Sequence, residues 1–179
     1  MEAVLQAAIA LLGRRPDASM EEIAAAAGVS RQTIYAHYPS RQALLRAVTQ
    51  HITGVVAGEL GRLDLRGGSA TDALTRWLDA AWEILRRYPV LLTPAMTVPD
   101  GDQDEIELHE PITGGLVRLI NRGRRLREFE RAMPTAWYLA AIIALGHAAG
   151  QEVAAGRMTV AQAGVAFRES VLRVLRAPS

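Results

Sequence analysis

Apolar residues recur three or four positions apart along almost the whole chain. This spacing gives segments such as 5–12, 45–56 and 74–85 one apolar face and one polar face, which is typical of amphipathic helices. No stretch shows the strict alternation of apolar and polar residues that a half-buried strand needs. The pattern therefore predicts an all-α protein of about nine helices.

Capping residues and breakers place the boundaries of the first helices. Ser19 and Glu22 have the spacing of a capping box, which predicts the start of a second helix. Gly28 ends that helix, and Ser30 and Ser40 can each cap a further one. Beyond a linker at 65–69 we expect helices at about 70–88, from 89, and at 111–129, 134–155 and 159–176, with an irregular acidic stretch at 99–110.

Residues 21–38 carry the pattern of a helix-turn-helix. Ile23, Ala24 and Ala27 give the first of its two helices an apolar face, and Gly28 permits the positive φ of a tight turn. The short helix that follows must project from the body so that its first residues reach base edges in a major groove about 12 Å wide. We therefore predict a DNA-binding domain over residues 1–50 and a helical ligand-binding and dimerisation domain over 51–179.

The side chains of the short helix suit DNA. Arg31, Gln32 and Thr33 form its first turn and include the donors and acceptors that read guanine or adenine edges. Side chains able to donate hydrogen bonds to phosphates surround them: Ser19, Tyr35, His37, Tyr38 and Arg41. An ordinary helical hairpin is the alternative, but it leaves two aromatic hydroxyls without a purpose.

At these residues the sequence resembles the TetR family of bacterial transcriptional regulators, over roughly residues 4–50. The matching stretches are Ile23-Ala24, Gly28-Val29-Ser30, Thr33-Ile34-Tyr35, His37-Tyr38-Pro39-Ser40-Arg41 and Ala43-Leu44-Leu45. The sequence departs from the family at the turn after the first helix, where Arg15-Pro16-Asp17 replaces the usual glycine and aromatic residue.

The resemblance implies a homodimer that binds a palindromic operator in double-stranded DNA, usually as a repressor. It also implies that a small molecule, which the sequence does not identify, releases the DNA by occupying the C-terminal domain. By position in the motif, it implies base contacts from Arg31, Gln32 and Thr33, and phosphate contacts from Tyr35, His37, Tyr38 and Arg41.

The last two predicted helices favour dimerisation. They are rich in small and apolar residues and are joined only by residues 156–158, so they should be antiparallel neighbours that pair with their copies in a four-helix bundle. Such a bundle would hold two recognition helices about 34–36 Å apart, one turn of DNA. The predicted interface comprises Leu139, Ile142, Ile143, Gly146, Gly150, Phe167, Val171 and Leu175.

Most of the aromatic residues fall in the C-terminal part, which predicts a largely apolar ligand pocket there. Its predicted lining comprises Trp82, Leu85, Tyr88, Leu92, Met96, Leu116, Ile120 and Trp137. Packing in the protein core is the alternative for each of these residues.

Composition narrows the function further. The 179 residues carry a formal net charge of +1 and no cysteine, which excludes disulfides, thiolate metal sites and a cysteine nucleophile. No apolar run approaches the roughly 20 residues that cross a bilayer, and no basic leader opens the chain, so we expect a cytoplasmic protein without membrane contact.

Charged clusters give no metal site and no second function. Asp100, Asp102 and Asp104 imitate a calcium loop, but Glu105 and Pro111 stand where glycine and glutamate are needed. The arginines between positions 118 and 131 are expected to form a solvated helix face.

No metalloprotease helix, phosphate-binding glycine loop or nucleophile elbow occurs, so we expect no enzyme and no cofactor. The prediction is a ligand-responsive transcriptional regulator; the alternatives are a helical protein-interaction adaptor and an enzyme on a helical scaffold.

Overall fold

The computed structural model describes residues 2–92 and 102–176. In this part of the chain the helices are α1 (Glu2–Leu12), α2 (Met20–Ala26), α3 (Arg31–His37), α4 (Arg41–Gly61), α5 (Ala70–Arg87), the 3₁₀ helix η1 (Pro89–Leu92), α6 (Asp102–Arg125), α7 (Thr135–Ala154) and α8 (Val160–Leu175). Extended pairing among the described residues is limited to one isolated bridge between Phe129 and Arg176. The predicted all-α class is therefore confirmed.

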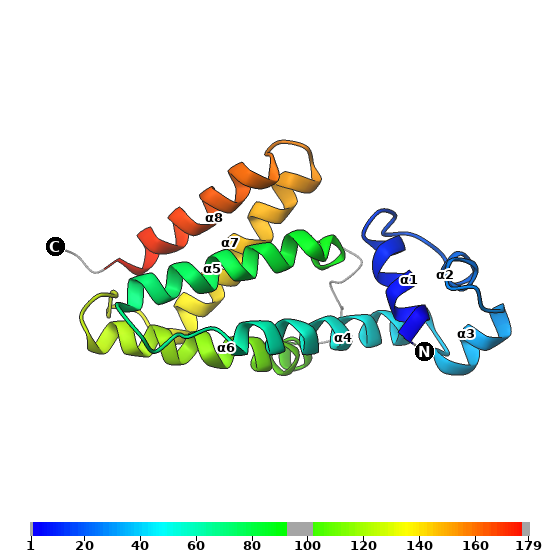
Figure 1. Cartoon of the computed structure of the whole chain (residues 1–179), viewed down its shortest axis with the longest axis horizontal. Coiled ribbons are helices and arrows are strands. Elements are labelled where there is room, and N and C mark those ends of the chain that lie inside the picture. The colour runs from blue at the N-terminus through cyan, green and yellow to red at the C-terminus, as the bar shows by residue number, and fades with distance from the viewer. Residues whose placement is uncertain (1, 93–101, 177–179) are drawn as a thin grey trace.

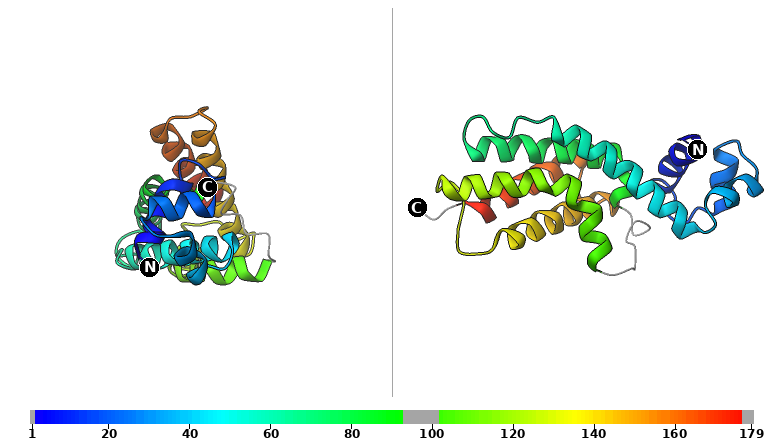
Figure 2. Two further views of the ribbon diagram at one scale, coloured as in Figure 1. Left: turned by 90° about the vertical axis from the view of Figure 1, so that its right-hand side faces the viewer. Right: turned by 90° about the horizontal axis from the view of Figure 1, so that it is seen from below.

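The molecule is elongated, with the three short N-terminal helices at one end (Figure 1). Helix α4 leaves this group and runs beside α6, while α5, α7 and α8 build the rest of the larger bundle. The view from below shows the same separation, with α1 to α3 beyond the end of the bundle (Figure 2). A boundary placed after residue 50 falls inside α4, so one continuous helix joins the two parts.

Helix α4 forms part of the core of both parts. Its buried apolar residues are spaced by four and form a single stripe: Leu44, Val48, Ile52, Val56 and Leu60. That spacing places the side chains on one face of the helix. The first part of α4 packs against α1, and the later part packs against α6 and α5. A shift of α4 therefore moves the small domain relative to the bundle.

The 3₁₀ helix η1 makes a second connection between the two parts. Val90 is completely buried, and η1 contacts α1, α5 and α7. The approach is close at Gly13, where a Cβ atom would lie 3.5 Å from the backbone nitrogen of Val90. The end of α1 and the start of η1 are thus in direct contact at this point.

The structure differs from the sequence prediction at the start of α6. Helix α6 begins at Asp102, whereas the sequence predicts a start at Pro111. The helix continues through this proline. The expected irregular stretch at 99–110 is therefore wrong from residue 102 onward. Asp100 lies outside the described residues.

Two arginines at the end of α6 hold loops in place instead of forming a solvated face. Arg122 donates hydrogen bonds to the carbonyl oxygens of Arg66 and Ser69, the latter at 3.0 Å. Arg124 donates to the hydroxyl of Thr135 at 2.7 Å. Both side chains are half-buried, so the expectation of a solvated arginine surface is wrong for these two residues.

The residues predicted for the dimer interface mostly lie inside the protomer. Those buried in the single chain are Ile142, Gly146, Gly150, Phe167, Val171 and Leu175, whereas Leu139 and Ile143 are half-buried. Helices α7 and α8 pack on each other as predicted, and a Cβ on Gly146 would lie 3.5 Å from the ring of Phe167. The stripe of small residues therefore serves packing within the chain.

Among residues 2–92 and 102–176, no helix combines the length and the apolar character that a bilayer crossing requires.

Arg41 stabilises the small domain instead of pointing freely toward solvent. Its guanidinium donates one hydrogen bond to the carbonyl oxygen of Pro16, at 2.6 Å, and another to that of Ala18. These carbonyls belong to the loop between α1 and α2, where the sequence departs from the family pattern. The clamp uses two of the five N–H donors of the guanidinium, and it fixes the direction of the side chain toward the loop.

We predict that Arg41→Met lowers the free energy of unfolding by about 1–3 kcal/mol, since two charge-assisted hydrogen bonds are lost while the aliphatic stem is kept. Urea unfolding followed by far-ultraviolet circular dichroism measures this change. Arg46→Met, an exposed position on the same helix, is the control and should stay within about 0.5 kcal/mol of the wild type. Equal stability of the two variants would show that the clamp contributes nothing.

Candidate nucleic-acid interface and effector domain

The turn between α2 and α3 is built on one glycine. Gly28 has a φ of +69°, in the left-handed region that side chains rarely adopt. The amide of Val29 then donates to the carbonyl oxygen of Ala24 at 3.0 Å, which closes the end of α2. A residue with a Cβ at position 28 would be strained, so this glycine sets the angle at which α3 leaves α2.

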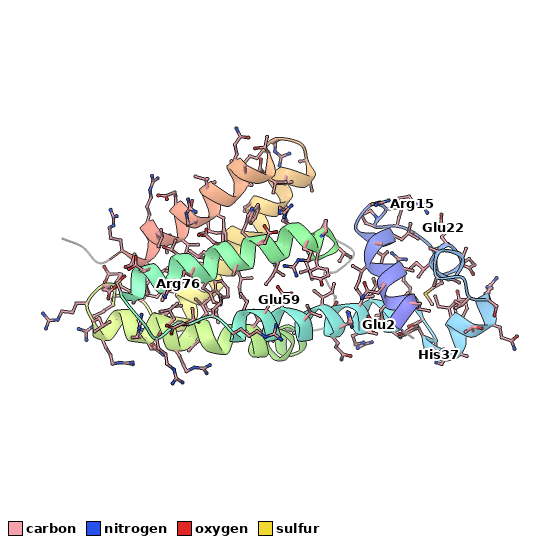
Figure 3. The ribbon with its side chains drawn as sticks, in the orientation of Figure 1. Glu2, Arg15, Glu22, His37, Glu59 and Arg76 are labelled. Atoms are coloured by element: carbon pink, nitrogen blue, oxygen red, sulfur yellow. The ribbon has the colours of Figure 1, made fainter. Side chains whose placement is uncertain are left out.

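A capping box fixes the start of α2. The Ser19 hydroxyl accepts from the Glu22 amide at 3.2 Å, and the Ser19 amide donates to the Glu22 carboxylate at 2.7 Å. Figure 3 shows Glu22 next to Arg15, whose guanidinium lies 2.7 Å from the carboxylate. The Ser19 amide, followed by the Arg15 side chain, lowers the pKa of Glu22 below its ordinary value.

Helix α3 buries one side chain in the core of the domain. Ile34 is completely buried, and it is the one residue of α3 in the buried class. The predicted DNA-contacting residues of this helix are all exposed: Arg31, Gln32, Thr33, Tyr35 and His37. Helix α3 lies at the end of the molecule away from the bundle, where His37 can be seen in Figure 3. The structure thus brings these five side chains together on one projecting helix.

The first turn of α3 carries two defined polar arrangements. The Thr33 amide donates to the Ser30 hydroxyl at 3.1 Å, and the two hydroxyls lie 2.8 Å apart, which caps the helix. Arg31 extends outward, and its Nε lies 3.1 Å from a carboxylate oxygen of Glu21 on α2. Sequence reasoning did not include Glu21, because its distance of ten positions from Arg31 in the sequence reveals no contact.

Tyr38 differs from the other predicted phosphate ligands. Only 7% of this residue is exposed, because it packs at the end of α3 against the domain core. Burial and, second, the carboxylate of Glu2 raise the pKa of the Tyr38 phenol. The main role of Tyr38 in the structure is packing. Of the two tyrosines predicted to contact phosphates, only Tyr35 is exposed.

The residues predicted to line one effector pocket do not gather in one place. Leu116 and Ile120 are completely buried, Leu85 and Tyr88 are half-buried, and 59% of Trp137 is exposed. The Leu92 side chain and Met96 lie outside the description. The expected common lining is therefore not formed, since these side chains face the core, the surface and α8 in turn.

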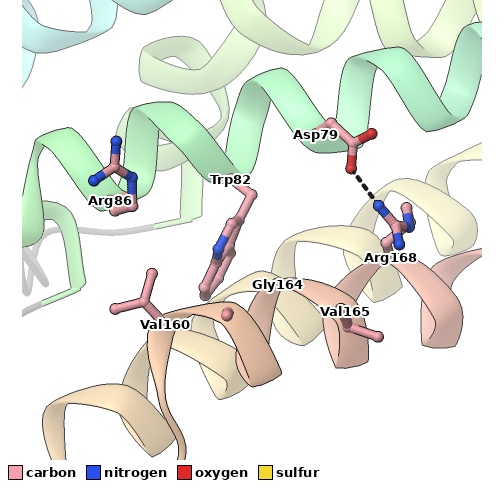
Figure 4. A pocket seen from close by; sticks show the side chains of 8 residues that line it. Asp79, Trp82, Arg86, Val160, Gly164, Val165 and Arg168 are labelled. Carbon is pink, nitrogen blue, oxygen red and sulfur yellow. Dashed lines mark hydrogen bonds and ion pairs between the residues drawn. The ribbon is translucent and has the colours of Figure 1, made fainter.

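Trp82 lies in an external groove of about 400 Å³ between α5 and α8. Figure 4 shows its indole between Arg86 and the Asp79–Arg168 ion pair, above Gly164. A Cβ on Gly164 would lie only 2.5 Å from the indole nitrogen, so the glycine makes room for the ring. Trp82 also packs on Phe167, with ring centroids 6.0 Å apart.

One buried polar group in the bundle is unexplained by packing. Tyr138 on α7 is only 2% exposed, and its hydroxyl has no hydrogen-bond partner among the described residues. An unpaired buried hydroxyl costs about 1–3 kcal/mol. The bundle interior therefore holds a polar atom whose hydrogen-bonding capacity the described residues leave unsatisfied.

No group of metal-binding side chains occurs in the part of the chain that the structure describes.

Comparison with known proteins agrees with this arrangement. Residues 4–48 match the family model of the bacterial regulatory proteins of the tetR family. The HTH-type transcriptional repressor LfrR of Mycolicibacterium smegmatis is 37% identical over 82 residues, which cover 46% of this chain and 43% of that protein. The chain thus aligns with less than half of the length of this curated relative.

Solved structures match over nearly the full length. The TetR-like regulator LfrR from Mycobacterium smegmatis in complex with proflavine has a TM-score of 0.73 and 26% identity, covering 99% of this chain and 98% of that one. The regulator FadR from Bacillus subtilis in complex with stearoyl-CoA has a TM-score of 0.81 and 13% identity, covering 97% and 98% of the two chains. The second likeness concerns the fold alone.

The matched proteins are transcriptional regulators. The N-terminal segment at residues 4–48 thus matches the bacterial regulatory proteins of the tetR family, and the chain is similar over nearly its full length to the TetR-like transcriptional regulator LfrR.

Proposed function

We propose that this regulator is a repressor that binds a palindromic operator as a homodimer and leaves it when a small molecule enters the bundle. The observation that supports DNA binding best is the exposed first turn of α3, which carries Arg31, Gln32 and Thr33 on a helix whose one buried residue is Ile34. Those side chains read bases in a major groove. A repressor of this kind acts in the cytoplasm, where bacterial DNA lies.

The other exposed polar residues of the small domain set the position of the protein on the duplex. Tyr35, His37 and the Ser19 hydroxyl can donate to phosphate oxygens, which fixes orientation without reading sequence. Tyr38 and Arg41 act indirectly, by holding the core and the loop behind α3.

The dimer forms through the outer faces of α7 and α8. Val165 is 52% exposed, and with Ala161 it makes a ridge between the Trp82 groove and a second hollow of about 490 Å³. A ridge flanked by hollows suits the packing of a second helix. On α7 the outer stripe consists of Trp137 and exposed alanines at positions 140, 144 and 148. A two-fold axis there would place the two α3 helices about 34–36 Å apart.

Effector binding reaches the DNA through α4 and η1. Ile52 and Val56 are buried and Val55 is half-buried where α4 meets the bundle, so a ligand that shifts these contacts moves the small domain. Coupling of about 1–3 kcal/mol would lower operator affinity about 5- to 150-fold.

The effector is a small, largely apolar molecule with a polar group for Tyr138. The bundle provides mostly aliphatic and aromatic side chains, and the unpaired Tyr138 hydroxyl gives one hydrogen bond to such a ligand. The similarity to LfrR, solved with proflavine, makes that compound a suitable probe.

The first prediction concerns DNA binding. Arg31→Ala should lower affinity for the intergenic duplex beside the gene about 5- to 150-fold and relax discrimination at one base pair, because one bidentate base contact is lost. Tyr35→Phe should weaken binding equally for all sequences. Fluorescence anisotropy at a stated salt concentration, with scrambled competitor duplex, measures both.

Arg125→Ala, which removes an exposed arginine at the other end of α6, is the control and should leave operator binding unchanged. Equal affinity of the wild type for operator and scrambled duplexes would contradict the repressor proposal and support the adaptor alternative.

The second prediction concerns the dimer. Val165→Glu should give monomers at micromolar concentration, because it places a charge on the ridge that meets the partner. Val174→Glu is the matched control: this valine is 41% exposed on the opposite face of α8 and should leave the dimer intact. Size-exclusion chromatography with light scattering decides, and a monomeric wild type would refute the dimer.

The third prediction concerns the effector. Tyr138→Phe should weaken proflavine binding several-fold while operator binding persists, and it should not lower thermal stability, because no hydrogen bond within the protein is lost. Proflavine fluorescence and thermal unfolding measure the two effects. Trp82→Ala is the contrast, since it tests the external groove. A loss of binding in Trp82→Ala alone would move the site to that groove, and no binding by the wild type would exclude this class of ligand.

A further inference from the structure

Arg31 is held from two sides before any DNA is bound. Its Nε lies 3.1 Å from a carboxylate oxygen of Glu21, and its guanidinium carbon lies 5.5 Å from the ring centroid of Tyr35, one turn along α3. The side chain is nevertheless 72% exposed, so the restraint comes from these two neighbours and not from burial. An exposed arginine that reads bases is thus already oriented in the free protein.

The atom that Glu21 contacts decides what Arg31 can still do. A guanidinium has five N–H donors in a plane, one on Nε and two on each terminal nitrogen. Because the ion pair engages Nε, the two terminal nitrogens remain for a second partner. These two nitrogens form the fork that binds O6 and N7 of guanine in the major groove.

We infer that Glu21 is a positioning residue that aims the Arg31 fork at a guanine, and that each operator half-site contains a guanine at the base pair facing Arg31. This inference rests on the proposed DNA-binding function. Glu21 is suited to the role because it belongs to α2, which packs against α3, and because its own side chain is 45% exposed. Its carboxylate does not touch the base; it acts through Arg31.

A simple competitor role for Glu21 makes the opposite prediction. If the carboxylate only competes with DNA for Arg31, its removal raises affinity for every duplex. If it aims the fork, its removal lowers affinity for the operator, because Arg31 has to lose its rotamer freedom on binding. Removal of the negative charge would at the same time leave non-specific affinity equal or higher.

The experiment starts from a duplex that the wild-type protein selects from a random-sequence library. Glu21→Ala should lower affinity for this duplex about two- to fivefold, the range of an exposed ion pair, while affinity for a scrambled duplex stays equal or rises. The affinity of Glu21→Gln for the selected duplex should lie between those of Glu21→Ala and the wild type, because the glutamine amide oxygen can still accept a hydrogen bond from Arg31 Nε. Glu83→Ala, which breaks the exposed pair with Arg86 on α5, is the matched control and should change neither affinity.

Affinity is also measured for duplexes that differ at one base pair each. If Glu21 only stabilised the fold, its removal would not change discrimination at one particular base pair. Glu21→Ala should relax discrimination at the same single G·C pair as Arg31→Ala, and replacing that guanine with 7-deazaguanine, which lacks N7, should remove most of the difference between Glu21→Ala and the wild type. In the Arg31→Ala background, Glu21→Ala should have no further effect on that pair. The salt dependence is recorded for each duplex, since it reports phosphate contacts.

Two results would overturn the inference. One is equal gains in affinity for operator and scrambled duplexes in Glu21→Ala. The other is a loss spread over all base pairs with unchanged thermal unfolding. A wild type that selects no sequence refutes the proposed function itself, whereas a wild type and an Arg31→Ala variant that behave as expected, beside a Glu21→Ala variant with wild-type discrimination, refute only the role of Glu21.

Discussion

The buried stripe along α4 is the contact on which the rest of the structure depends. Its first residues, such as Leu44, close the core of the small domain, and its later residues, such as Ile52 and Leu60, belong to the core of the bundle. Because packed interiors resist small displacements, one helix shared by two cores transmits movement instead of absorbing it. Together with Val90 of η1 against the end of α1, this stripe couples the helical bundle mechanically to the small N-terminal domain.

The DNA-binding end combines a rigid base with an exposed working face. Gly28 sets the turn, Ile34 anchors α3, and the capping serines Ser19 and Ser30 satisfy the first amides of α2 and α3. The other side chains of α3 are exposed. Among them, Arg31 contacts Glu21 and Tyr35. The supporting network thus extends beyond the residues proposed to contact the duplex.

Several sequence predictions about individual residues had to change in the structure, and for one reason. Arginines were expected to face solvent or phosphate, but Arg41 and Arg122 donate to backbone carbonyls of loops distant in sequence. The small residues of α7 were assigned to a partner subunit, but Gly146 faces Phe167 of the same chain. In each case the sequence indicates the chemistry of the side chain. The partner that it contacts lies far away in the sequence, so a local pattern does not reveal it.

Local interactions explain what the sequence by itself determined: the all-α class, most helix boundaries and the helix-turn-helix. Apolar spacing, capping serines and Gly28 act over a few residues, so a linear pattern records them. Only the tertiary structure decided which face of α7 and α8 is buried, that Trp82 lies against α8 and not in a shared pocket, and that Glu21 meets Arg31. These outcomes depend on how helices pack in three dimensions, and helical periodicity reveals an apolar face without revealing which surface will cover it.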